Sequence, residues 1–293
     1  MFDSGPVRVG AFRCGVGHPD FAVAGRISRP LIAFARASVW IQRQGEPPFV
    51  ADPGLVTFYN RDQPYSRAPL SAEGDRSDWF SLDESIAFEI AAAVDPESED
   101  DRQNPFRPAW APCPPALYLA QRVLFERLRA REPMDPLGVE EQVVEIVAAA
   151  LGRGAQRLGS NRRALWPGEA RSRHLAQAAR AELDARFTEP LSLSQLARLL
   201  GASGFHLCRA FRGEMGTTLH VHRNQLRLRA SLERIAEGEP DIARLAVDLG
   251  FSSHSHFTLS FRRAFGLTPS LARRQLMTGG RRRLGELQRS ACR

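Results

Sequence analysis

Arginine is the residue type whose number and placement most clearly suggest a chemistry. All 40 basic residues of the 293-residue chain are arginine, and the net charge is +7. Residues 186–293 contain 18 Arg against 8 acidic residues, whereas residues 1–185 contain 22 Arg against 25 acidic residues. The planar guanidinium group forms paired hydrogen bonds with phosphate and guanine. The C-terminal part is therefore suited to a polyanionic partner, although a biased genomic base composition also explains the preference for Arg over Lys.

Histidine and cysteine are the residues to examine for a metal centre or an enzyme. Of the seven histidines, only His18 precedes residue 174, whereas a metal-dependent barrel enzyme needs two or three histidines and a carboxylate. Cys14, His18 and Cys113 remain a candidate thiolate and imidazole set, with small buried cysteines as the alternative. The chain also lacks a G-x-S-x-G elbow, a phosphate-binding loop and a zinc-protease motif. We expect no enzyme, no cofactor and no metal.

The composition bounds the architecture and the compartment. A chain of this length with 43% apolar residues has enough material for two domains. Neither a long apolar run nor a secretory leader is visible, and the four cysteines, which include Cys208 and Cys292, are scattered. We expect a cytoplasmic protein that does not enter a membrane.

The arginine-rich part contains an internal duplication that must position these side chains. The first copy runs from Leu193 to Gly216 and the second from Ile242 to Gly266. Each has a small residue (Ala197; Ala246), a glycine four residues later (Gly201; Gly250), and then a serine, either Ser203 or one of the pair Ser252 and Ser253. A small residue permits a close helix crossing, glycine ends a helix, and serine caps the next one. The pattern predicts two helix-turn-helix units.

A continuous helix is predicted between the two copies, from Leu219 to Glu237, ending at Gly238. About 20 residues at ~1.5 Å each give a rod of ~30 Å, close to the ~34 Å between successive major-groove faces of B-DNA. One chain could thus place two helices in neighbouring turns of the groove.

Residues 191–274 closely resemble the DNA-binding domain of the AraC/XylS family of transcriptional regulators. The resemblance is strongest in residues 250–257 (GFSSHSHF) and 261–270 (FRRAFGLTPS). It implies that Arg209 is the best candidate for a guanine contact. It also implies DNA-contacting roles for Gly204, Phe205, Cys208, Arg209, Arg212, Ser253, His254, Ser255, Thr258, Arg262 and Arg263. Structural roles are expected for Ala197, Gly201, Ser203, Ala246, Gly250, Phe251, His256, Gly266 and Pro269.

Several of these assignments leave alternatives open. Phe205 either contacts thymine methyl groups or packs on the first helix as a hydrophobic staple, and Cys208 is equally suited to packing. The second unit departs from the family because Leu259 stands where a basic side chain is common. That unit is therefore expected to read fewer bases and to rely on phosphate contacts from Arg262 or Arg263.

The N-terminal half has a different pattern. Short apolar stretches between Gly and Pro turns, such as 55–59 and 78–82, predict strands, and two amphipathic helices are predicted at 115–130 and 138–151. Two charged segments, 59–65 and 73–79, are candidates for effector binding, with salt-bridged turns as the alternative. The half also resembles, more loosely, the cupin-like sensor of the family.

We therefore expect an α+β multidomain protein. Its parts are a sensor and dimerisation domain over 1–155 (cupin-like β-barrel or sandwich 1–110, helical hairpin 115–151), a linker over 156–170, an all-α DNA-binding domain with two helix-turn-helix units over 171–280, and a basic tail over 281–293.

The expected function is sequence-specific binding of double-stranded DNA by a homodimeric regulator that an unidentified small-molecule effector controls. The alternative is a regulator without an effector, whose N-terminal half only dimerises or contacts RNA polymerase. The arginines at 281–283 either add phosphate affinity or form a solvated tail.

Overall fold

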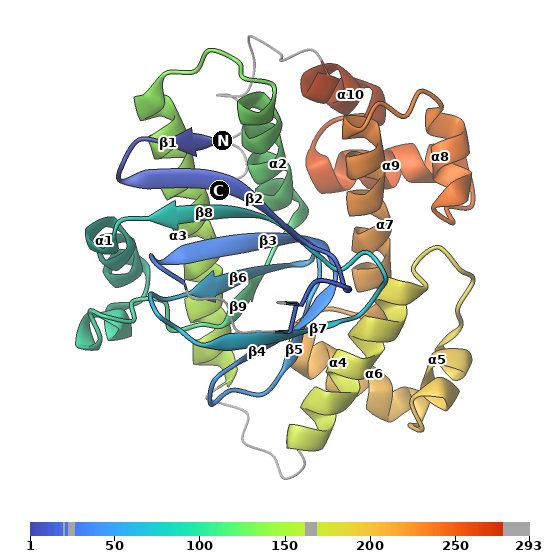
Figure 1. Ribbon diagram of the computed structural model, residues 1–293. Helices are drawn as coiled ribbons and strands as arrows, with labels where there is room; N and C mark the ends of the chain where they lie inside the picture. Colours follow the sequence, from blue (N-terminus) through green and yellow to red (C-terminus); the bar gives the residue numbers. More distant parts are fainter. Residues whose placement is uncertain (20, 23–26, 162–168, 278–293) are drawn as a thin grey trace. The chain divides into compact units, whose positions relative to one another are not determined.

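The computed structural model describes residues 1–19, 21–22, 27–161 and 169–277 (Figure 1). The chain divides into two compact units, Met1–Leu165 and Trp166–Arg293, and each is described by itself. The predicted basic tail at 281–293, Cys292 and residues 162–168 of the predicted linker lie outside the described residues.

The described part of the N-terminal unit contains two antiparallel sheets. The larger has the order β1-β2-β8-β3-β6-β9 and the smaller the order β5-β4-β7. The larger sheet consists of β1 (Phe2–Asp3), β2 (Val7–Cys14), β3 (Leu31–Ala37), β6 (Leu55–Tyr59), β8 (Asp75–Leu82) and β9 (Trp110–Pro112). The smaller consists of β4 (Val39–Arg43), β5 (Phe49–Ala51) and β7 (Tyr65–Pro69).

The sequence predicts a barrel or a sandwich, and the described strands do not close into a barrel. The larger sheet ends at β1 and β9, which contain two and three residues. Such short edge strands present few backbone groups for further pairing, so the sheet stays open. The prediction of a strand-rich N-terminal half is confirmed, and the cupin-like barrel is not.

Two elements occupy a region where the sequence predicts strands alone. These are the helix α1 (Glu84–Val94) and the 3-10 helix η1 (Pro96–Asp100). The buried residues of α1 are Ala87, Ile90 and Ala91. This three-to-four spacing is helical, but it extends over barely two turns and is easily mistaken for the apolar run of a strand.

The predicted helical hairpin is present and its second helix is longer than expected. It consists of α2 (Pro115–Arg129) and α3 (Pro136–Asn161). A Cβ atom on Gly154 would lie 2.6 Å from Pro108 Cγ, so α3 approaches this loop closely. The Arg157 guanidinium stands 3.9 Å from the centroid of the Trp110 ring. These contacts extend α3 over residues 156–161, which the sequence predicts as linker.

A buried charge network joins α2 to the larger sheet. Asp78 Oδ2 accepts hydrogen bonds from Arg36 Nη1 at 3.1 Å, Gln121 Nε2 at 2.8 Å and Arg122 Nη1 at 3.0 Å. Arg122 also bonds to Glu126 one helical turn later. The network holds β8 against α2 through the side chain of Asp78. Removal of any one partner would leave an uncompensated buried charge, which is strongly destabilising.

The C-terminal unit is helical throughout its described ordered elements, as predicted. Its helices are α4 (Glu169–Ala185), α5 (Leu193–Leu199), α6 (Gly204–Met215), α7 (Leu219–Ala236), α8 (Ile242–Asp248), α9 (His254–Phe265) and α10 (Pro269–Met277). The pairs α5–α6 and α8–α9 are the two predicted helix-turn-helix units, and α7 is the predicted connecting helix.

Each helix-turn-helix unit has its own core. In the first, Leu207 and Phe211 of α6 pack with Leu183 of α4 and Leu196 of α5. In the second, the Phe257 ring packs at a steep angle against the rings of Phe251 and Phe261, with ring centroids 5.1 and 5.6 Å apart. These buried faces leave the opposite faces of α6 and α9 to solvent.

Within the described ranges, no helix is long and apolar enough to cross a membrane.

Candidate functional site

The turn glycines set the angle between the two helices of each unit. Gly201 and Gly250 have φ values of +61° and +78°. This left-handed region strains residues with a Cβ atom and favours glycine. Ala197 and Ala246 are buried where the helices cross. The short pattern Ala-x-x-x-Gly thus orients α6 against α5 and α9 against α8.

Serine side chains begin the second helix of each unit. Ser203 Oγ accepts a hydrogen bond from the His206 backbone at 3.2 Å, and Ser253 Oγ accepts one from His256 at 3.1 Å. Of the two serines that the sequence offered as caps, Ser253 is the cap. Ser252 Oγ instead lies 3.0 Å from His256 Nδ1. This bond ties the turn to the first turn of α9.

The solvent face of α6 carries the candidate base-reading residues. Phe205, Cys208, Arg209 and Arg212 are exposed, and Phe205 is 72% exposed. The Arg209 guanidinium lies 5.6 Å from the centroid of the Phe205 ring, a cation–π contact on the surface. Gly204 starts the helix beside them, half-buried against Leu193.

The solvent face of α9 is less basic at its start. His254 and Ser255 are exposed and Thr258 is half-buried, while His254 Nε2 lies 3.4 Å from Thr258 Oγ1. Leu259 is 48% exposed. Arg262 and Arg263 stand exposed in the last turn of the helix, about two turns after His254 and Ser255.

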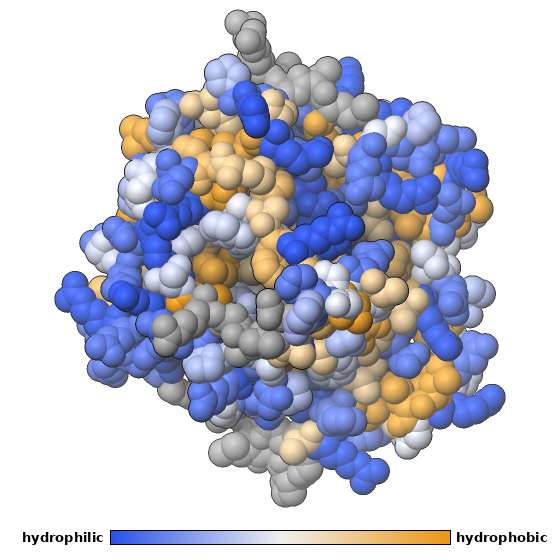
Figure 2. Space-filling model, in the orientation of Figure 1, coloured by the Kyte–Doolittle hydropathy of each residue, from blue (hydrophilic) through white to orange (hydrophobic). Residues whose placement is uncertain are grey.

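The remaining candidate structural residues close the second unit. Phe251 is buried, and its ring meets that of His256 with centroids 5.7 Å apart. Gly266 ends α9 with φ of +74°, and Pro269 begins α10. Leu193 and Leu199, at the two ends of α5 in the first unit, are also exposed. Figure 2 shows orange surface over α5 at this place.

Arg227 of α7 connects the two units, and sequence reasoning did not single it out. Its Nε donates to Phe187 O at 2.5 Å, in the loop before α5, and its Nη1 donates to Gly250 O at 2.7 Å, in the second turn. Burial and, second, nearby Arg223 lower the pKa of the Arg227 guanidinium. The sequence shows only an arginine on the connecting helix, because the two carbonyl groups that Arg227 bonds to lie far from it along the chain.

Known proteins with similar sequences match the helical unit. Residues 196–275 match the helix-turn-helix domain family. The regulatory protein SoxS of Escherichia coli K12 is 34% identical over 96 residues, which cover 33% of this chain and 90% of SoxS. This chain belongs to the AraC/XylS family of transcriptional regulators.

Other relatives extend the comparison of this AraC/XylS-family chain. The HTH-type transcriptional regulator GlxA of Rhizobium meliloti is 32% identical over 133 residues, covering 45% of this chain and 38% of GlxA. The match thus spans less than half of that relative's length. A solved AraC-type DNA-binding-domain protein from Chromobacterium violaceum is 30% identical over 38% of this chain and 99% of its own, with a TM-score of 0.35.

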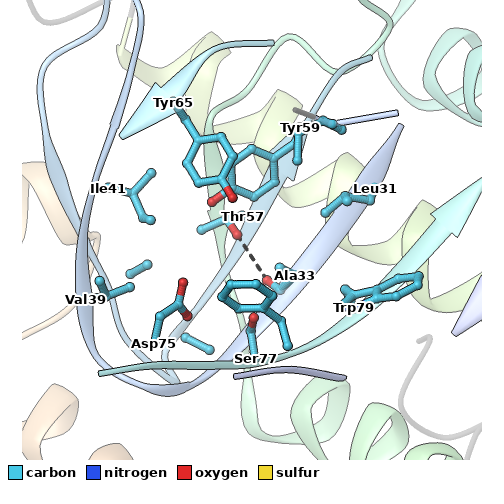
Figure 3. A pocket seen from close by; sticks show the side chains of 14 residues that line it. Leu31, Ala33, Val39, Ile41, Thr57, Tyr59, Tyr65, Asp75, Ser77 and Trp79 are labelled. Atoms are coloured by element: carbon cyan, nitrogen blue, oxygen red, sulfur yellow. Dashed lines mark hydrogen bonds between the residues drawn. The ribbon is translucent and has the colours of Figure 1, made fainter. Parts of the chain in front are cut away.

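The N-terminal unit of this family member contains a cavity of about 240 Å³ between its two sheets. Strands of the larger sheet contribute Phe12, Leu31, Ala33, Ala35, Thr57, Tyr59, Asp75, Ser77 and Trp79, and strands of the smaller contribute Val39, Ile41, Ala51 and Tyr65 (Figure 3). Ile27 completes the lining. Alternate residues of β8 face the cavity because side chains of a strand point to opposite sides in turn.

The two distinctive N-terminal segments divide between this cavity and the surface. Tyr59, Tyr65 and Asp75 line the cavity. Arg61 instead forms ion pairs with Asp62 and Glu84 on exposed side chains. Salt-bridged turns thus account for Arg61, whereas Tyr59, Tyr65 and Asp75 stay candidates for effector binding.

The candidate thiolate and imidazole set was Cys14, His18 and Cys113. In the part of the chain that the structure describes, no group of three or more His, Cys, Asp or Glu side chains could hold a metal ion. Cys14 and Cys113 are both buried.

Proposed function

We propose that this protein binds double-stranded DNA at specific sequences through α6 and α9 and regulates transcription there. The observation that carries the proposal is the pair of serine-capped helices with exposed polar faces, each preceded by a turn with a left-handed glycine and both packed on the single helix α7. Two reading helices on one chain favour an extended target site.

The residues of α6 carry most of the proposed base recognition. An exposed arginine on a recognition helix can donate two hydrogen bonds to guanine O6 and N7, and Arg209 has this position. Phe205 is too exposed to act as a staple of the core, which favours contact with thymine methyl groups. Cys208 and Arg212 lie on the same exposed face.

The residues of α9 carry a smaller share. His254, Ser255 and Thr258 offer neutral polar groups to base edges, and Arg262 and Arg263 offer charge to phosphates. Ser253 is engaged as the cap and His256 bonds to Ser252, which favours structural roles for both. Arg263 and Arg262 would position the helix rather than read sequence.

The length of α7 fits two contacts on one face of DNA. Its 18 residues span ~27 Å at ~1.5 Å per residue, near the ~34 Å between equivalent major-groove positions. Arg227 would keep the two units from turning independently because it bonds to carbonyls on both sides.

The cavity favours control by a small-molecule effector over an effector-free regulator. A preformed, mainly apolar pocket with a few polar groups is the usual form of a small-molecule site. A homodimer through residues 115–151 and a contact with RNA polymerase stay predictions.

Selection of bound duplexes from a random pool tests the proposal on the full chain. We expect an enriched site with two conserved blocks whose centres are ~10 base pairs apart, protected together in a footprint. The expected footprint lies on one face of the duplex.

The decisive condition is near-physiological salt, ~0.15 M, where unspecific phosphate attraction is screened. Equal affinity for all duplexes in that buffer would contradict the proposal. A site with only one conserved block would contradict the two-helix part of it.

A further inference from the structure

The cavity of the N-terminal unit has the size of a compact ring compound. Its volume is about 240 Å³, whereas a protein cavity of ~150 Å³ holds benzene. One six-membered ring with a side chain of two or three heavy atoms would therefore fill it.

The walls determine the shape and polarity of an occupant. Apolar side chains from both sheets form most of the lining. The Trp79 indole lies flat on β2: a Cβ atom at Gly10 would stand 2.3 Å from its Cζ2 atom. This close approach holds the indole in place as one wall and leaves a rigid apolar surface for a ring.

The polar side-chain groups of the lining residues are the hydroxyls of Thr57, Tyr59, Tyr65 and Ser77, the Asp75 carboxylate and the Trp79 indole N–H. Figure 3 shows the Tyr59 and Tyr65 rings side by side near Thr57, with Asp75 and Ser77 across the cavity and the Asp75 carboxylate directed into it. None of the fourteen described lining residues is Arg, Lys or His. The described lining thus offers no cation to an organic anion.

The Asp75 carboxylate makes the cavity selective for hydrogen-bond donors. Arg67 Nη1 donates to Asp75 Oδ2 at 3.1 Å, and the guanidinium itself packs on the rings of Phe12 and Phe21. Burial raises the pKa of the Asp75 carboxyl, and Arg67 opposes this shift. A donor group beside the carboxylate would stabilise its ionised form, whereas a second carboxylate would repel it.

The geometry points to a ligand of one chemical class: a single-ring apolar molecule whose short side chain ends in a hydroxyl or amino group, bound between the two sheets with that group at Asp75. Carboxylates of the same shape are excluded. This inference rests on the effector part of the proposed function and specifies it.

Three phenyl compounds of similar size test the inference on the full chain: 2-phenylethylamine, 2-phenylethanol and phenylacetate. At millimolar concentration the amine and the alcohol are expected to raise the melting temperature, because a ligand that binds only the folded state stabilises it. Phenylacetate is expected to leave it unchanged. Equal or greater stabilisation by phenylacetate, or none by either donor probe, would overturn the inference.

Two variants locate the binding. Ala33→Leu fills the cavity and is expected to abolish both shifts, while Ala11→Leu, on the exposed side of β2, is the matched control and keeps them. Stabilisation that survives Ala33→Leu would place the ligand elsewhere and overturn the inference.

A third variant tests the carboxylate. Asp75→Asn keeps the side-chain size and is expected to weaken binding of the amine about tenfold, because a charge-assisted hydrogen bond is lost. Should Asp75→Asn not fold, Tyr65→Phe, which removes one hydroxyl and keeps the ring, is measured instead and is expected to weaken the alcohol. Unchanged affinities in the folded variant would overturn the role of the polar wall.

The selection of duplexes is run in parallel without probes. Selective DNA binding without a response to the donor probes would remove the inference and leave the proposed function. Probe binding by a chain with no preference among duplexes would support the inference and contradict the proposed sequence-specific DNA binding.

Discussion

The two helix-turn-helix units have helices of equal length, turns that differ by one residue and different surroundings. The first packs on α4, with an aliphatic core, and presents Phe205 and Arg209 at the start of its second helix. The second has a core of phenylalanine rings in tilted and edge-to-face contact and presents His254 and Ser255 at the start of its second helix. Similar turns can thus be combined with different cores and with different exposed faces on the second helix.

The turn glycines offer the strongest way to distinguish the units. Gly250→Ala is expected to destabilise the protein by about 2–5 kcal/mol, because left-handed strain adds to displacement of the surrounding backbone. A Cβ atom at Gly250 would stand 2.5 Å from Thr188 O, whereas a Cβ atom at Gly201 would have no neighbouring atom within 4 Å. Gly201→Ala should therefore cost about 1–2 kcal/mol from strain alone. Urea unfolding of both variants measures the difference between their free energies of unfolding. Equal decreases in the two variants would show that the contact with Thr188 is unimportant.

Arg227 tests whether the units depend on each other. Arg227→Ala removes donors to carbonyls on both sides of α7 and is expected to cost about 1–3 kcal/mol of stability. It should also reduce the preference for the original spacing of the two sequence blocks, measured with duplexes that carry insertions between them. Arg223→Ala is the control, because Arg223 donates to Leu191 O on the first side. An unaltered spacing preference in Arg227→Ala would argue against the bridging role.

The reading faces should differ in binding energy. Arg209→Ala is expected to weaken binding by about 1–3 kcal/mol and to relax preference at one base pair. Arg209→Lys keeps the charge without the paired donors and should lose the same preference with a smaller loss of affinity. His254→Ala or Ser255→Ala should change the other block. Equal weakening on all duplexes would discredit these roles.

Leu259 offers the smallest effect and a gain of binding. Leu259→Arg places a cation on the exposed face of α9, where the first unit already has arginine. We expect tighter binding and a salt dependence steeper by about one unit in the logarithmic slope, as for one more phosphate contact. Leu259→Gln is the uncharged control. A slope that stays the same in Leu259→Arg would place this position away from the DNA backbone.

The helical unit was largely predictable because its signals are local. Ala197 and Gly201, or Ala246 and Gly250, act within one turn of each other, and Ser203 caps the helix that it begins. What the sequence left open was the choice between Ser252 and Ser253, since either serine could reach an orphan backbone amide and the conformation of the turn decides between them.

The N-terminal unit was less predictable because its elements depend on pairing. The strand 55–59 was found from its own residues, but whether the sheets close depends on the lengths of edge strands and on partners far along the chain. The extension of α3 beyond residue 151 likewise depends on Pro108 and Trp110, which the sequence does not place beside it.

The amino-acid sequence by itself determined the duplicated turn, the Ser203 cap, the connecting helix and the basic character of the C-terminal half, since each depends on neighbours within a few residues. Only the tertiary structure decided that Arg227 spans two turns and that Tyr65, Asp75 and Trp79 enclose one cavity. Those groups meet because sheet pairing and helix packing bring distant residues within a few ångströms, and neither the spacing nor the composition of the chain records such distances.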